Sequence, residues 1–225
     1  NMGASDIGCG TKTWGAQIVA EELGVPLERI SVEHADTGTT QFATPSGGSK
    51  TVPTESPAIR SAALEVKQQL YAMAAEQLKL PAADLELRGA EVVSKADATK
   101  KVALGQIQAF GRRGLIVGIG YRAPNPQGSA VNPFGAQFAE VEVNTKTGEI
   151  KVLRFLAAHD SGRILNEKMC RNQVFGGITM GIGFGLTEDR VMDDAQLGKL
   201  LTVNLHDYKM PTALDAPADK TMVII

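Results

Sequence analysis

The stretch AQFAEVEVNTKTGEIKVLRFLAA, residues 136–158, carries the clearest secondary-structure signal of the chain. Apolar Phe138, Val141 and Val143 mark a first strand, and a second apolar run follows after a polar interval. The residues between the two runs, Asn-Thr-Lys-Thr-Gly at 144–148, are typical of a turn in which glycine adopts a left-handed conformation. The sequence therefore predicts a β-hairpin here.

The segment that follows the hairpin, residues 167–186, predicts a helix although it contains five glycines. Each glycine inside a helix costs about 1 kcal/mol relative to alanine. A helix of this kind is expected to pack closely against another backbone or a ligand. Gln173 lies in this apolar segment, and its amide must find hydrogen-bond partners or face water. A ligand or backbone contact and a solvent-facing side chain are equally compatible with the sequence.

The remaining segments mix helices and strands without regular alternation. We expect helices over residues 13–22, from Ser56–Pro57 to Leu78, and over 104–110. We expect strands over 29–33, 115–121 and 222–225, and a hairpin around Gly89 over 85–93. This pattern predicts an α+β fold rather than a doubly wound sheet. No internal repeat and no clear linker interrupts the chain, so residues 1–225 are expected to form a single piece.

The composition excludes several classes of protein. A hydrophobic fraction of 43% over 225 residues excludes a wholly disordered chain, and a net charge of −2 offers no footprint for nucleic acid or an anionic membrane. No apolar run is long enough for a membrane span. Cys9 and Cys170 cannot form a disulfide framework. Both chain ends look cut, which predicts that the natural protein is longer.

Two glycine-rich loops precede predicted helices, namely residues 8–11 (Gly-Cys-Gly-Thr) and 46–51 (Ser-Gly-Gly-Ser-Lys-Thr). The N–H groups at a helix start can hold a phosphate or another anion. Neither loop matches the P-loop or the dinucleotide-binding fingerprint. A plain turn before a helix and a surface loop remain alternatives, but two such loops together favour an anion site.

Catalytic candidates are few. Cys9 could be a nucleophile or a ligand, but the sequence favours a small residue in a tight loop, because a catalytic Cys needs a paired His that the sequence cannot place. His159 beside Asp160 permits acid–base chemistry, although a structural histidine at a strand end explains it as well. Cys170 has no partner at metal-ligand spacing. The sequence therefore predicts no metal ligand set and no catalytic residue.

Six segments, in this order, resemble the molybdopterin-binding large subunit of the xanthine dehydrogenase/aldehyde oxidase family. They are residues 6–11 with 17–24, 48–51, 135–143, 157–166, 173–183 and 207–212. The resemblance extends over nearly the whole chain. Each motif alone is weak, but six in register are specific.

The resemblance implies a cofactor and the residues that hold it. The cofactor is molybdenum on a pyranopterin, which in bacteria is often the cytosine dinucleotide form. The carried-over cofactor-binding residues are Gly8, Cys9, Gly10, Thr11, Gly48, Ser49, Thr51 and Gln173. Backbone N–H groups, hydroxyls and amides suit an anionic, polar cofactor. Cys9 departs from the family, because several relatives carry Gln at that position.

The resemblance also implies an activity and partners. The parent enzyme would oxidise an aldehyde or an N-heterocycle with oxygen from water and pass electrons to iron–sulfur and FAD subunits or domains. The family's catalytic Glu would lie beyond Ile225, so the fragment itself would be inactive. A standalone cofactor-binding or interaction module is the alternative. A nucleotide-phosphate enzyme is less favoured, because Lys12 and Lys50 are the only cations near the loops.

Overall fold

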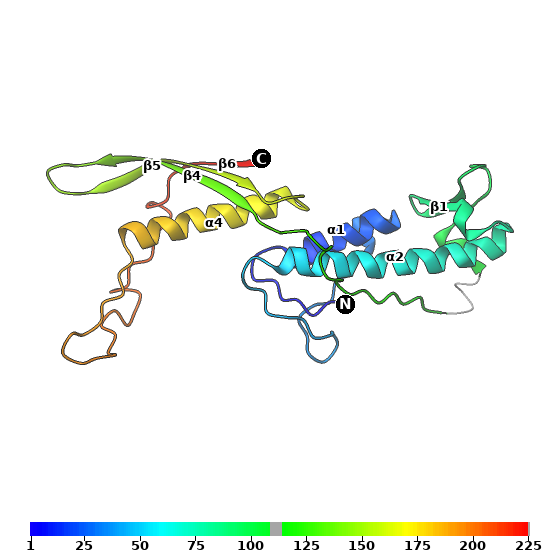
Figure 1. The fold of residues 1–225 in the computed structure, drawn as a ribbon, viewed down its shortest axis with the longest axis horizontal. Helices are drawn as coiled ribbons and strands as arrows, with labels where there is room; N and C mark the ends of the chain where they lie inside the picture. Colours follow the sequence, from blue (N-terminus) through cyan, green and yellow to red (C-terminus); the bar gives the residue numbers. More distant parts are fainter. Residues whose placement is uncertain (109–113, 225) are drawn as a thin grey trace. The chain divides into compact units, whose positions relative to one another are not determined.

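The computed structural model describes residues 1–108 and 114–224 and divides into two compact units after Ser129 (Figure 1). Helices combine with two separate three-stranded sheets, which confirms the predicted α+β class. Each unit is described by itself.

Two packed helices, α1 (Thr11–Leu23) and α2 (Thr51–Leu78), form the centre of the first unit. They run in the same direction. A Cβ at Gly15 would lie 3.5 Å from Ile59 Cδ1, and further along both helices Glu22 Oε2 lies 3.6 Å from Lys67 Nζ. The N-terminal ends of α1 and α2 therefore lie at the same end of the helix pair.

The ends of α1 agree with the sequence, but the start of α2 does not. Gly24 ends α1 with φ 57°, as predicted. Helix α2 begins at Thr51, five residues before the predicted Ser56–Pro57 start, so that prediction was wrong. Pro57 lies inside the helix and has no N–H to donate to the Pro53 carbonyl. Instead, Arg122 Nε donates to Pro53 O at 3.1 Å.

A small antiparallel sheet packs on the C-terminal half of α2. Its strands are β1 (Leu85–Arg88), β2 (Glu91–Ser94) and β3 (Lys101–Ala103). The predicted hairpin around Gly89 is confirmed, and Gly89 has φ 58°. The shared core contains Leu70, Met73, Ala74, Leu85, Val92, Val102 and Ile107. Burial of these apolar side chains is what holds sheet and helix together.

The described part of this unit also contains three short 3₁₀ helices: η1 (Leu27–Arg29), η2 (Ala82–Asp84) and η3 (Leu104–Gln106). The strand predicted over 29–33 is wrong, because η1 takes up its first residue and only an isolated bridge, Met2 to His34, follows. Of the helix predicted over 104–110, residues 104–106 form the single turn η3, Gln108 is again helical, and the last two residues lie outside the described chain. The strand predicted over 115–121 is wrong in one respect: the segment is paired with no other strand in the described part of the chain.

The second unit is one sheet covered by one helix. Strands β4 (Phe134–Val143) and β5 (Ile150–Asp160) form the predicted antiparallel hairpin, whose turn places Gly148 at φ 77°. Strand β6 (Asp219–Ile224) pairs parallel to β5, so the order is β4-β5-β6.

Helix α4 (Glu167–Leu186) has the predicted bounds. It starts where Asn166 Oδ1 accepts from Met169 N–H at 3.0 Å, a typical N-cap. Ile178 and Ile182 pack against Ala157 of β5, which makes the core of this unit. Among the described helices, none combines the length and apolar character needed to cross a membrane.

Candidate functional site

Asp6 organises the first glycine-rich loop. Its Oδ1 accepts from the N–H groups of Gly8 at 2.9 Å and Gly10 at 3.1 Å. Partial burial opposes ionisation of Asp6, but hydrogen bonds from the N–H groups of Gly8, Gly10, Thr11 and Lys12 outweigh it and hold the pKa of the carboxyl below its usual value. The chain's own carboxylate therefore caps the start of α1.

The two side chains that end this loop point into the protein. Thr11 is fully buried, and its hydroxyl lies 3.4 Å from Ser5 O and 3.1 Å from Cys9 Sγ. Cys9 is half-buried, and its Sγ lies 3.9 Å from Asp6 Oδ1. A hydroxyl and a carboxylate are thus the polar neighbours of this thiol, which favours a packing role in the loop.

The second loop leaves the start of α2 open. Gly48 and Ser49 both have positive φ, 68° and 57°, and both are exposed. A Cβ at Gly47 or Gly48 would meet no atom within 4 Å. The side chain of Lys50, the residue before α2, makes no capping hydrogen bond, and the first turn of α2 holds no acidic residue. This helix start therefore retains N–H donors that an anion can accept from.

The two loops meet at the Ser5 carbonyl. Ser46 Oγ donates to Ser5 O at 3.0 Å, and the same oxygen is the acceptor for Thr11 Oγ1. Main-chain hydrogen bonds from Met2 N–H to Glu33 O and from Ala35 N–H to Met2 O tie the N-terminal segment to the irregular stretch before α2. Because α1 and α2 run in parallel, the positive ends of both helix dipoles lie at this side of the unit.

Seven of the eight predicted cofactor-binding residues lie in these two loops, and Gln173 does not. Those seven are Gly8, Cys9, Gly10, Thr11, Gly48, Ser49 and Thr51. Gln173 is an exposed residue of α4, in the second unit. The geometry of the first unit brings the loops together from two separate helices, which sequence alone did not establish.

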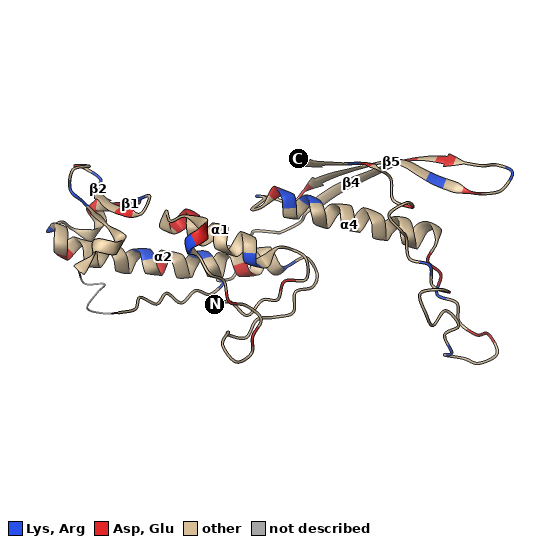
Figure 2. Ribbon diagram, turned by 180° about the vertical axis from the view of Figure 1, so that it is seen from behind, with Lys and Arg blue, Asp and Glu red and all other residues tan. Residues whose placement is uncertain are grey.

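The glycines of α4 lie on an open face. A Cβ at Gly176, Gly177, Gly181 or Gly185 would meet no atom within 4 Å. Gly183 is different, because a Cβ there would collide with Glu188 and with Pro211 Cδ. Beyond its first turns, α4 carries almost no charged residue (Figure 2). The atoms close to Gly183 belong to side chains, so the predicted close approach of another backbone is not found at these glycines. A ligand-facing role for the open glycines stays a prediction.

Asp6 and Ser5 are the site residues that sequence reasoning missed. The signal for Asp6 was present as Asp6-Ile-Gly8-Cys-Gly10, an acidic residue two and four positions before glycines that donate to it. Ser5 acts through its main-chain oxygen, so no residue-type signal could have found it.

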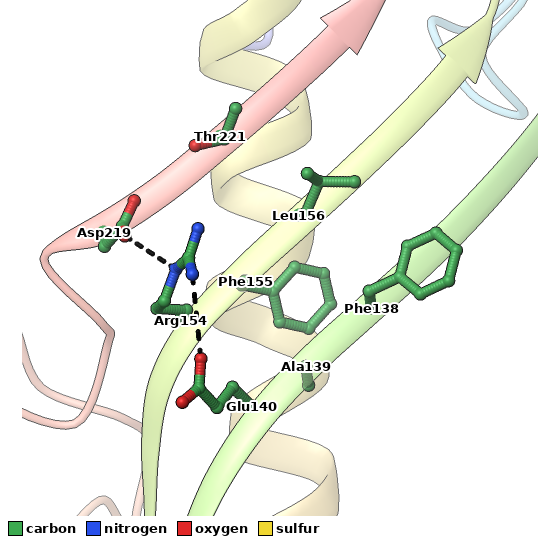
Figure 3. A pocket seen from close by; sticks show the side chains of 8 residues that line it. All are labelled: Phe138, Ala139, Glu140, Arg154, Phe155, Leu156, Asp219 and Thr221. Atoms are coloured by element: carbon green, nitrogen blue, oxygen red, sulfur yellow. Dashed lines mark ion pairs between the residues drawn. The ribbon is translucent and has the colours of Figure 1, made fainter.

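A separate hollow of about 240 Å³ lies on the face of the β4-β5-β6 sheet opposite α4 (Figure 3). Arg154 lies between two carboxylates there, 2.9 Å from Asp219 and 3.8 Å from Glu140. Phe138 and Leu156, paired across β4 and β5, form its apolar side. The arginine charge is already compensated, so this hollow lacks the free donors that an anionic ligand requires.

Comparisons with known proteins agree with this fold. A family profile described as the molybdopterin cofactor-binding domain matches residues 1–217. The putative xanthine dehydrogenase molybdenum-binding subunit of Escherichia coli K12 is 35% identical over 224 residues, covering 96% of this chain and 29% of that protein. The aldehyde oxidoreductase molybdenum-binding subunit of the same strain is 30% identical, covering 98% of this chain and 29% of that protein.

A solved structure shows the same arrangement. The CO dehydrogenase from Oligotropha carboxidovorans superposes with a TM-score of 0.85 at 27% identity, over 99% of this chain and 28% of that chain. The chain thus spans less than a third of the length of these relatives.

Proposed function

Since the chain belongs to the family of molybdopterin cofactor-binding domains, we propose that residues 1–225 form one piece of the cofactor-binding region of a molybdenum hydroxylase. The observation that carries this proposal is the meeting of two glycine-rich loops at the parallel N-terminal ends of α1 and α2. A helix N-terminus that follows a glycine-rich loop is suited to bind a phosphate-bearing, anionic cofactor.

The residues of the first unit fit such a group. Space is open beside Gly8, Gly47 and Gly48, and a shallow hollow of about 420 Å³ lies next to the first turn of α1, lined in part by Lys12 and Thr13. The donors are main-chain N–H groups and hydroxyls, which suit an anionic and polar molecule.

We assign the residues different parts in this site. Exposed Gly48 and Ser49 would hold the cofactor directly, whereas buried Thr11 and Thr51 shape the loop ends. Gly8, Cys9 and Gly10 belong to the loop that Asp6 fixes. Gln173 of α4, in the second unit, is proposed separately as an amide contact to the cofactor.

The bound cofactor would supply a two-electron oxidation of an aldehyde or N-heterocycle, with oxygen taken from water. The residues described here bind and orient it. We further propose that the cofactor is the cytosine dinucleotide form, that the catalytic Glu lies outside residues 1–225, and that electrons leave through iron–sulfur and FAD subunits or domains. Relatives named as xanthine dehydrogenase and aldehyde oxidoreductase subunits support this class of reaction.

A charge placed in the second loop tests the assignment. Ser49→Asp, made in the full-length protein and expressed in a host that synthesises the cofactor, sets a carboxylate against an anionic ligand at the α2 start. We expect molybdenum and pterin per protein to fall at least about tenfold, with the circular dichroism spectrum unchanged. Ser129→Asp, the same change at an exposed serine outside both loops, should retain the cofactor. Full cofactor content in Ser49→Asp would contradict the proposal.

A second measurement separates catalysis from binding. The full-length protein should oxidise aldehydes or N-heterocycles with a dye acceptor, and Ser49→Asp should lose turnover in proportion to its lost molybdenum. A protein that binds the cofactor but oxidises neither class would instead be a non-catalytic binding module.

A further inference from the structure

Residues 115–121 lie in an extended conformation along α2 (Figure 1). A Cβ on Gly118 would collide with the main chain of Ala62, and one on Gly120 with the main chain of Ala58. Two residues of the segment therefore cover four residues of the helix, which rise about 6 Å. An advance of about 3 Å per residue is that of a β-strand.

The segment has two different faces, as a strand does. Ile116, Gly118 and Gly120 face the helix and are half-buried. The alternate residues point outward and are apolar, with exposed fractions of 72% at Leu115, 54% at Val117, 73% at Ile119 and 75% at Tyr121. A strand with one face on a helix and a second apolar face in water lacks part of its packing.

Only one edge of the segment is satisfied. Gln69 Nε2 donates to Val117 O at 2.7 Å, and Ile119 N–H donates to Glu65 Oε2 at 2.8 Å. Successive residues of an extended chain direct their N–H and C=O groups to opposite edges. Within residues 1–108 and 114–224, no main-chain hydrogen bond joins Ile116, Gly118 or Gly120 to another segment.

We propose that a β-strand from the full-length polypeptide, outside residues 1–225, pairs with residues 115–121 at this edge. The added strand would form hydrogen bonds with the N–H and C=O groups of Ile116, Gly118 and Gly120. Its apolar side chains would pack beside Val117 and Ile119. The unpaired segment thus becomes part of a sheet laid on α2.

The area of the exposed row favours an occupant on the same polypeptide. Its four side chains present on the order of 500 Å² of apolar surface, which is below the roughly 800 Å² per partner of a stable interface between separate proteins. A strand on the same polypeptide has a high effective concentration at this edge, so it can bind stably while burying less apolar area. The relatives carry about 70% of their length outside the matched region, which is ample chain for such a strand.

Amide exchange in the full-length protein tests the pairing directly. Residue-resolved hydrogen–deuterium exchange should show the amides of Ile116, Gly118 and Gly120 exchanging at least about 100-fold slower than unstructured amides. Exchange of all three at nearly unstructured rates would overturn the proposal.

A substitution pair tests the outward face. Ile119→Asp in the full-length protein should lower the temperature of its first unfolding transition by about 5 °C, because the strand pairing buries this position. Gln127→Asp, which adds the same charge at an exposed residue just beyond the segment, should change it by less than about 1 °C. Equally small shifts of the two variants would overturn the proposal. If Ile119→Asp halved the mass of the protein in light scattering, the partner would be a second copy of the chain, which would also overturn it.

Discussion

The carboxylate of Asp6 accepts a hydrogen bond from the main-chain N–H of Gly10, with 3.1 Å between Oδ1 and N, at the residue that precedes α1. An acidic side chain of the chain itself therefore stands at a helix start that is otherwise suited to a cofactor anion. The start of α2 has no such side chain. The two loops are thus electrostatically unequal, and the Gly48–Ser49 loop is the better place for the most negative part of a ligand.

Removing the Asp6 cap should destabilise the first unit. We expect Asp6→Ala to lower the free energy of unfolding by about 1 kcal/mol, the usual cost of losing an N-terminal cap. Urea unfolding followed through Trp14, the single tryptophan and a buried residue of α1, measures this change. Asp84→Ala, at an exposed aspartate in the same unit, is the control and should have little effect. Equal effects of the two variants would show that Asp6 is not a cap.

The contribution of Asp6 should depend on pH in one direction. Because the pKa of Asp6 in the folded protein lies below its ordinary value near 3.8, folding favours the ionised form. The contribution of the Asp6 carboxylate to the free energy of unfolding is complete above that value. It is lost as the pH falls through the folded-state pKa. The difference in unfolding free energy between the unchanged chain and Asp6→Ala should therefore be constant from about pH 7 to 5 and shrink by about pH 2.

The comparison with Asp6→Ala isolates this one carboxyl. The pKa values of Asp97 and Asp215 are also lowered, by hydrogen bonds from Thr99 and from Thr212. Both groups are unchanged in the variant, so their acid dependence cancels in the difference. A difference that stays constant down to pH 2 would rule out the ionised carboxylate as the source of stability.

Restoring a helical N–H at position 57 should stabilise α2. Pro57→Ala provides the donor that the Pro53 carbonyl lacks within the helix, and we expect a gain of about 1 kcal/mol. Pro53→Ala is the matched control, because Pro53 lies in the first turn, where its missing N–H costs nothing. Its effect should stay within about 0.5 kcal/mol. Urea unfolding of both variants, with Trp14 fluorescence, makes the comparison; a loss of stability in Pro57→Ala would refute it.

Two glycines of α4 should respond oppositely to alanine. Gly183→Ala drives a Cβ into Glu188 and Pro211 and should cost about 1–3 kcal/mol. Gly181→Ala meets open space and should stabilise the helix by about 1 kcal/mol. Thermal unfolding of the 225-residue chain, followed by far-UV circular dichroism, distinguishes them. Identical shifts would contradict the packing described around Gly183.

Elements whose signals are local were predictable. The hairpin over 136–158 follows from its apolar residues and a glycine turn, and the helix over 167–186 follows from a long apolar segment. The start of α2 was missed because its second proline is tolerated through Arg122, which is distant in sequence from Pro53. Residues 115–121 have a strand's alternation, but no strand in the described part of the chain pairs with them, and a strand's pairing leaves no signal in the segment itself.

The candidate site was predictable in its residue types and not in its assembly. Glycines before two helices marked both loops, but their meeting at Ser5 O depends on the parallel packing of α1 and α2. Packing of that kind follows from tertiary contacts and leaves no mark on the loops themselves.

The hydrogen bond from Ser46 to Ser5 joins loops that are 41 residues apart in sequence. Each loop thereby restricts the conformations open to the other, so the entropic cost of ordering them is shared. A ligand that immobilises the Gly48–Ser49 loop would leave less conformational freedom to be lost when it contacts residues 8–11. We therefore expect a ligand that contacts both loops to bind them cooperatively.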